Sequence, residues 1–271
     1  MQGSAGGCRW RCRRNDPSRG YTTAARPTPV ATAGACDGGA CVICLESDPP
    51  HIQSGCACRG DAGFAHVECR AEAATHRMTQ SDALDGWWKC GTCGQEFTGA
   101  MRLGLAEVWW STVHHLPKDD KQQFPAANIL ALAFQEQGRY PEAEAKYREN
   151  LRVARRGLGS ENPTTLDTVG NLAALLSIQG KFIEAEPMYR EVIAFQRRVL
   201  GPEHEDTLRT AENLANTLVR LGKHAEAKMM HRETLAIQQR VLGPEHPDTV
   251  WMANRLAEYV GAVKGTADSA K

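Results

Sequence analysis

No uninterrupted apolar run in this 271-residue sequence reaches the ~18 residues that a membrane-spanning helix needs, so no segment is expected to cross a bilayer. The 32 basic and 32 acidic side chains cancel, which argues against the generally basic surface of a nucleic-acid-coating protein. A glycine-rich phosphate loop, a nucleophile paired with a base and a distinctive carboxylate pair are all missing. We therefore expect no self-contained enzymatic chemistry, no small-molecule substrate and no nucleic-acid partner.

Cysteine is absent from the last 178 residues, because all ten cysteines lie at or before Cys93. Residues 1–40 are rich in Gly, Ala, Thr and Pro, contain six Arg against two Asp, and show no apolar periodicity. This composition predicts a disordered, solvated tail. An organelle transit peptide is the alternative, whereas the missing apolar h-region argues against a secretory signal peptide. Residues 264–271 are expected to form a second disordered tail.

Residues 41–98 contain a regular set of thiol and imidazole side chains, in four close pairs. The pairs are Cys41-x2-Cys44, Cys56-x-Cys58, His66-x2-Cys69 and Cys90-x2-Cys93. A Cys-x2-Cys turn places two thiolates near one tetrahedral centre, and Zn²⁺ is satisfied by four such ligands. Eight ligands predict two closed, structural Zn²⁺ sites. A disulfide framework is the competing interpretation, but it fits a secreted protein and gives the histidine no role.

The ligand order Cys-Cys-Cys-Cys-His-Cys-Cys-Cys resembles the RING-CH zinc finger and also the PHD finger. The single residue between Cys56 and Cys58 and the seven residues before His66 favour RING-CH, whereas Trp88, two residues before Cys90, is a PHD-like feature. The resemblance implies a cross-braced domain in which alternate pairs share a metal. One Zn²⁺ would be held by Cys41, Cys44, His66 and Cys69, and the other by Cys56, Cys58, Cys90 and Cys93.

RING-CH domains recruit a ubiquitin-conjugating enzyme (E2) and promote transfer by positioning it, without a nucleophile of their own. The resemblance implies that Val42, Ile43 and Trp88 face the E2. Two features depart from the family pattern. The helix expected over residues 70–78 is small and polar, and Gly94 follows the last ligand where many RING domains have a basic residue. These departures leave open a RING-like domain that only binds proteins.

Between the two halves of the chain, the pattern from Met101 to Leu116 predicts one amphipathic helix that contains Trp109 and Trp110. The polar segment from Pro117 to Pro125 predicts a linker. We therefore assign residues 99–124 to a connecting helix and linker. The paired Trp side chains are expected to pack, either sealing the end of the helical half or joining it to the cysteine domain.

The C-terminal half repeats itself every 42 residues. Gly138, Gly180 and Gly222 recur at this interval, as do Ala143, Ala185 and Ala227 and three Leu-Gly pairs. A fixed period of this length indicates stacked supersecondary units, none of which buries its apolar face alone.

Each repeat is predicted to contain two helices, which in the second repeat span Thr165–Ile178 and Phe182–Val199. Gly180 ends the first helix because glycine readily adopts positive φ. Gly201 and Pro202 end the second, and Asp206 or Thr207 is expected to cap the next helix.

The motif Gly180-x-Phe182-x2-Ala185-x3-Tyr189 resembles the tetratricopeptide (TPR) repeat, and the LGPEH-x-DT connector is similar to the kinesin-light-chain type. The resemblance implies about three repeats and a capping helix over residues 125–263. It also implies a peptide-binding concave face, formed by the first helix of each pair. Because Asn can bond a peptide backbone and Arg can pair with carboxylates, we expect this face to prefer an acidic or C-terminal peptide. The residues expected there are Asn128, Asn171, Arg209, Asn213, Asn216, Arg220 and Arg255.

The sequence thus predicts a mostly α protein, with a small cross-braced Zn₂ RING-like domain followed by an α-solenoid of TPR helix pairs. The leading functional hypothesis is a cytoplasmic RING-CH-type E3 ubiquitin ligase whose TPR stack binds the substrate. A non-catalytic zinc and TPR scaffold is the alternative, and a PHD-like histone-tail reader is a third. A nuclear or organellar location stays open.

Overall fold

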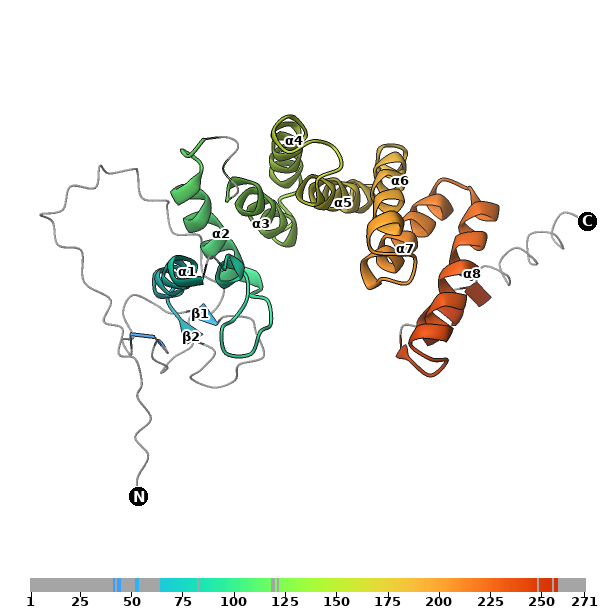
Figure 1. The fold of residues 1–271 in the computed structure, drawn as a ribbon, viewed down its shortest axis with the longest axis horizontal. Helices are drawn as coiled ribbons and strands as arrows, with labels where there is room; N and C mark the ends of the chain where they lie inside the picture. Colours follow the sequence, from blue (N-terminus) through green and yellow to red (C-terminus); the bar gives the residue numbers. More distant parts are fainter. Residues whose placement is uncertain are drawn as a thin grey trace, which may run out of the picture. The chain divides into compact units, whose positions relative to one another are not determined.

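The computed structural model describes residues 41, 43–44, 52–53, 64–81, 83–117, 120, 122–247, 249–254 and 256–257 (Figure 1). The chain divides into two compact units, Met1–Arg139 (unit 1) and Tyr140–Lys271 (unit 2). Helix dominates both units. Across the described ranges, no helix has the length and apolar character needed to span a membrane.

The described part of unit 1 contains a two-stranded antiparallel sheet, in which β1 (Ile52–Gln53) pairs with β2 (Phe64–Ala65). Helix α1 (Val67–Ser81) follows β2 after one residue. The 3₁₀ helix η2 (Asp85–Trp87) precedes the long helices α2 (Gly99–Val113) and α3 (Gln123–Glu136). Helix α1 packs against η2 and α2, and α2 also packs against α3.

Three tryptophans form the centre of the unit 1 core. The rings of Trp87 and Trp109 are stacked, with centroids 5.4 Å apart and planes 4° apart. Trp88 stacks on the same Trp109 ring at 5.9 Å. One apolar cluster extends from Cys41 to Ala126, so the cysteine-bearing segment, α2 and the start of α3 share a core. Of the two roles expected for the Trp pair, Trp109 therefore has the second, which is to join its helix to the cysteine domain.

Helix α2 departs from the amphipathic helix predicted over Met101–Leu116. It begins at Gly99, ends at Val113 and is buried on more than one side, because it packs against both α1 and α3. Arg102 lies inside this packing with only 4% of its surface exposed. Its guanidinium donates to the Phe97 carbonyl at 2.6 Å and forms ion pairs with Glu96 and Glu136. A buried arginine is tolerated here because these oxygens compensate its charge.

Gly104 on α2 lies close against the start of α1. A Cβ at this position would lie 2.7 Å and 2.9 Å from the two γ-methyl groups of Val67, the first residue of α1. Such distances are shorter than van der Waals contact. The absence of a side chain at Gly104 therefore sets how closely the start of α1 approaches α2.

Unit 2 is a series of antiparallel helix pairs that repeats the same geometry. Its helices are α4 (Tyr140–Gly157), α5 (Pro163–Ile178), α6 (Phe182–Val199), α7 (Glu205–Arg220) and α8 (His224–Val241). Each helix packs against the next along the chain. Helical backbone resumes at residue 247, where Thr249 and Met252 are buried.

Local sequence explains most of these boundaries. Gly180 and Gly222 adopt positive φ (78° and 75°) where α5 and α7 end, as predicted for Gly180. Helix α6 has the predicted bounds, and Ala185 is fully buried where it packs. Helix α5 begins two residues earlier than predicted, because the Asn162 side chain accepts a hydrogen bond from the Thr164 N–H.

The prediction that Asp206 or Thr207 caps α7 was wrong. The side chain that caps this helix belongs to His204, whose Nδ1 accepts from the Asp206 N–H at 3.2 Å, and neither Asp206 nor Thr207 is the capping residue. Thr207 instead donates to the Gly201 carbonyl within the connector. Sequence preference favoured the Asp and Thr, whereas the turn places His204 at the first non-helical position.

A ladder of ion pairs connects the second helices of successive repeats. Arg148 on α4 pairs with Glu184 on α6, and Arg190 on α6 pairs with Glu226 on α8, each at 2.7 Å. Lys181 pairs with Glu144 and Lys223 with Glu186 in the same periodic way. Exposed ion pairs contribute roughly 0.2–1 kcal/mol each, so the ladder fixes register more than it determines stability.

Replacing Gly104 with alanine is expected to destabilise unit 1 by about 1–3 kcal/mol, because the new methyl group overlaps Val67. Urea unfolding followed by tryptophan fluorescence measures this change. In the double variant Gly104→Ala/Val67→Ala, the free energy of unfolding should fall by less than the sum of the two single decreases, because the methyl groups of Val67 that would overlap the new one are gone.

The matched control is Gly170→Ala in α5, where the nearest atom to a new Cβ is 4.0 Å away. Circular dichroism should show no loss of stability for this variant, because alanine is the better helix former. Equal destabilisation by both substitutions would contradict the close approach at Gly104.

Candidate metal centre and repeat surfaces

His66 and Cys69 are placed together by the transition from β2 to α1. His66 is the single residue between strand and helix, and its carbonyl accepts the N–H of Arg70. Cys69 lies in the first turn of α1. Both side chains are buried. The strand-to-helix transition thus directs an imidazole and a thiol toward the same point.

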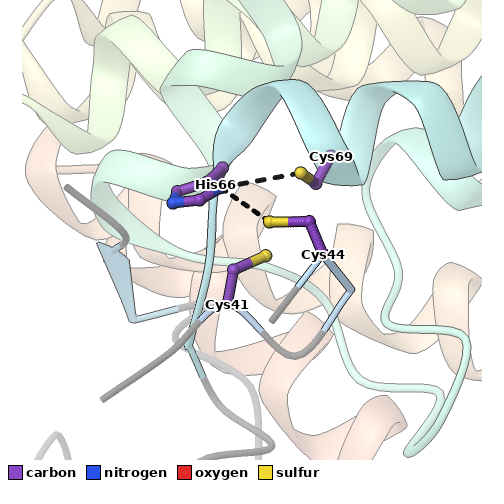
Figure 2. A group of neighbouring side chains, drawn as sticks. All are labelled: Cys41, Cys44, His66 and Cys69. Carbon is purple, nitrogen blue, oxygen red and sulfur yellow. Dashed lines mark hydrogen bonds between the residues drawn. The ribbon is translucent and has the colours of Figure 1, made fainter. Parts of the chain in front are cut away.

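Cys41 and Cys44 complete the group (Figure 2). The ligand atoms of Cys41, Cys44, His66 and Cys69 all lie within 4.8 Å of one another. His66 Nδ1 is 3.4 Å from the Cys44 sulfur and 3.6 Å from the Cys69 sulfur. We call these four residues the Cys/His cluster. Three sulfur atoms and one imidazole nitrogen in this arrangement can hold one metal ion.

The backbone around Cys41 favours the thiolate that metal binding requires. Burial alone would raise the pKa of the Cys41 thiol, but hydrogen bonds from the backbone N–H groups of Cys44, His66 and Ile43 more than offset it, so the pKa is lowered. The Ile43 N–H lies 3.4 Å from the Cys41 sulfur. No disulfide joins any two of the five cysteines that the structure describes.

Of the second predicted ligand set, the structure describes one pair. Cys90 is buried and Cys93 is exposed at the two ends of a tight turn. The Cys90 N–H donates to the Gln95 carbonyl, and the Gly94 N–H donates to the Cys90 carbonyl, both at 2.8 Å. Gly94 has a φ of 72°, a conformation that glycine adopts at little cost. Cys56 and Cys58 lie outside the described residues, so the set stays a prediction.

The three residues expected to face an E2 have different surroundings. Val42 lies outside the described residues. Ile43 is half-buried and packs against the unit 1 core. Trp88 is also half-buried, and its ring stacks on Trp109. Packing within unit 1 therefore already covers part of the Ile43 and Trp88 side chains.

The residues expected on the concave face lie on the first helices of the repeats. Asn171 on α5 and Asn216 on α7 are half-buried, whereas Asn213 is exposed. The Arg209 side chain is 70% exposed and pairs with Asp206 at 2.5 Å.

The other three members of this predicted set differ. Arg220 is exposed, and its guanidinium lies 5.0 Å from the centre of the Phe182 ring. Asn128 is buried in α3, in unit 1, and Arg255 lies outside the described residues. The described members of the set in unit 2 thus lie on two neighbouring first helices, α5 and α7.

Sequence reasoning missed a second surface of unit 2, which lies on the second helices. A cavity of about 430 Å³ opens between α4, α5 and α6. We call it the α4 groove. Its rim and floor include Arg148, Arg152, Arg155, Arg156, Leu172 and Met188. The signal was present in the sequence, because arginines at positions i, i+4 and i+7 share one face of a helix.

Comparison with known proteins agrees with this repeat geometry. The family model described as "Tetratricopeptide repeat" matches residues 123–198, 165–239 and 206–268, which together make up more than half of the chain. No curated protein matches the chain.

Solved structures share the fold. The TPR-like repeats of a Podosopora anserina protein described as a kinesin light chain are 21% identical, with a TM-score of 0.54 over 74% of this chain and 89% of that one. BtubC (BKLC) from P. vanneervenii is 20% identical, with a TM-score of 0.53 over 73% of each chain. With its 42-residue period and stacked helix pairs, the chain belongs to the tetratricopeptide repeat family.

Proposed function

We propose that this protein is a non-catalytic interaction scaffold, in which the TPR stack binds a peptide and the cysteine-bearing segment is folded around structural zinc. The observation that supports this function best is the family membership, since TPR stacks present a continuous helical surface to other proteins. Ligation by thiolates suits a reducing compartment, and we infer a cytoplasmic location.

Zinc is the metal that suits the Cys/His cluster. For Zn–S bonds of about 2.3 Å and Zn–N bonds of about 2.0–2.1 Å, tetrahedral geometry separates nitrogen from sulfur by roughly 3.6 Å. The Nδ1–sulfur distances of 3.4 Å and 3.6 Å are close to this value. Four protein ligands leave no open position, so this ion would stabilise the fold and perform no chemistry.

We infer a second zinc ion at Cys56, Cys58, Cys90 and Cys93. The support comes from the Cys90–Cys93 turn, whose backbone hydrogen bonds hold a Cys-x2-Cys pair in a compact loop beside the core. The RING-CH resemblance of the ligand order supplies the pairing with Cys56 and Cys58. A cross-braced pair of ions would tie both ends of this segment together.

Elemental analysis of the purified full chain is expected to find two zinc ions per molecule. Cys69→Ser and His66→Ala should each lose one ion and lower the midpoint of thermal unfolding, because the remaining three ligands bind zinc more weakly. His76→Ala is the matched control, since this half-buried histidine on α1 lies outside the cluster. Wild-type zinc content in Cys69→Ser, or none in the wild type, would contradict the proposal.

The peptide site that we propose is the concave face formed by α5 and α7. The exposed side chains of Arg209 and Asn213 lie on α7, and Asn171 lies on the neighbouring α5. Asparagine side chains can donate to and accept from an extended peptide backbone, while arginine pairs with carboxylates. These groups favour an extended peptide with acidic side chains or a free C-terminal carboxylate.

Fluorescence anisotropy with an extended, proline-spaced peptide rich in Asp and ending in a free carboxylate tests this site. Arg209→Gln combined with Asn213→Ala should weaken binding by about tenfold, equivalent to ~1.4 kcal/mol, because a charge-assisted and a neutral hydrogen bond are lost. Arg232→Glu on α8 removes positive charge elsewhere and should have a smaller effect. An unchanged affinity of the double variant would exclude the concave site.

The second candidate function is a RING-CH-type E3 ubiquitin ligase. It is favoured by the convergence of Cys41, Cys44, His66 and Cys69, the four residues that the RING-CH resemblance assigns to one ion. The partial burial of Ile43 and Trp88 speaks for the scaffold, because an E2 needs both to be accessible.

An in vitro ubiquitination assay against a panel of E2 enzymes separates the two functions. The scaffold predicts no ubiquitin chains with any E2, and no difference between the wild type and Ile43→Ala. Chain formation that disappears in Ile43→Ala, while the zinc content is unchanged, would establish the ligase and overturn the scaffold.

A further inference from the structure

The α4 groove combines a basic rim with an apolar floor. Arg148, Arg152 and Arg155 occupy one face of α4, and Leu172 and Met188 line the groove from α5 and α6. The arginine stripe extends to Arg156, so it spans about 12 Å along the axis at 1.5 Å per residue. All these residues belong to unit 2.

The ion-pair ladder neutralises only part of this charge. Arg148 pairs with Glu144 and Glu184, and Arg155 pairs with Glu191 at 2.8 Å. Arg152 is exposed and has no carboxylate partner within the described part of the chain. The groove therefore has positive charge in excess over the carboxylates that the structure places around it.

Comparison with the other repeats shows that the fold does not need an arginine at position 152. The residues 42 and 84 positions further along the chain are Ala194 on α6 and Ala236 on α8. The ladder arginine Arg148 is in contrast repeated as Arg190, which forms the same pairs with its neighbours. The extra charge of Arg152 is thus specific to the first repeat and outside the repeated framework.

We propose that the α4 groove docks an acidic amphipathic helix of a partner protein. Carboxylates spaced three and four residues apart on such a helix match the spacing of the arginine stripe on α4, since both follow one helix face. The apolar stripe of the partner helix covers the half-buried Met188 and the aliphatic stems of the arginines, above the fully buried Leu172, in the mode of a helix bound in a groove. This surface is separate from the concave face of α5 and α7, and its occupant is a helix and not an extended peptide.

The test uses the full chain and a fluorescein-labelled helical peptide of about four turns, built from Ala, Leu and Glu with a leucine stripe flanked by glutamates. Anisotropy should show binding that weakens about tenfold in Arg152→Glu and by a smaller factor in Arg152→Ala. Met188→Ala should also weaken it, because apolar contact area is lost. The unfolding midpoint of Arg152→Ala should stay that of the wild type, since the repeat itself has alanine at this position.

Three controls distinguish the groove from general electrostatic attraction. Arg232→Glu changes the net charge equally on α8, outside the groove, and should bind the peptide within about twofold of wild type. A peptide with the leucines replaced by glutamine should bind at least tenfold more weakly, because it cannot use the floor. The Arg209→Gln/Asn213→Ala variant should bind the helical peptide normally.

The proposal is overturned if the wild type fails to bind the peptide at millimolar concentration. It is also overturned if Arg232→Glu and Arg152→Glu weaken binding equally. A third result would also overturn it. If double-stranded DNA competes as effectively as unlabelled peptide, the groove binds any polyanion and not specifically a helix.

Discussion

The stacking of Trp87 and Trp88 on Trp109 is the contact on which the organisation of unit 1 depends. The segment that contains the cysteines is too short to bury a core by itself. It obtains one from α2, because Trp109 shares a core with Cys41, Cys69 and Cys90. Arg102 on the same helix also donates a hydrogen bond to the Phe97 carbonyl. Helix α3, although it begins the family match, therefore belongs physically to the same unit as the Cys/His cluster.

Unit 2 obtains its order from a different source. Each of its helices packs mainly against its neighbours in sequence, so the contacts are local and repeat with the chain. Fully buried alanines such as Ala143 and Ala185 allow close helix approach at equivalent positions. The protein thus combines a unit whose core is built around one aromatic stack with a unit whose stability accumulates repeat by repeat.

Features that depend on residues close together in the sequence could be predicted, whereas features that depend on tertiary packing could not. The bounds of α6 were predicted because Gly180 and Gly201 act locally, and the Cys/His cluster was predicted because metal ligation restricts residue type and spacing. The sharing of one core by the cysteine segment and α2 was predicted only as one of two roles for the Trp pair, because the choice between them depends on tertiary packing around Trp109. The cap at His204 was missed for a related reason, since the connector geometry overrides side-chain preference.

The surfaces of the helical repeats also differ in how far the sequence predicts them. The repeat phase alone assigned Arg209 and Asn213 to the first helix of their repeat, because the position within a repeat determines which helix contains a residue. The α4 groove was not predicted, because a concave surface depends on how the arginines of α4 pack beside Leu172 and Met188, although the repeat pattern pairs α5 with α6. Arg152 became informative only when its position was compared with the alanines of the later repeats.

The two ends of the ion-pair ladder differ in charge. Glu144 and Glu186 each receive an arginine and a lysine, whereas the equivalent residue on α8 is Lys228. If a 42-residue repeat from the middle of the array were duplicated ahead of α8, its Lys, Arg and Glu residues would form the same ion pairs with the helices on both sides. The same repeat joined beyond α8 would place one cation beside another. Internal duplication therefore preserves the ladder, whereas growth at the α8 side preserves it only with an acidic residue at position 228.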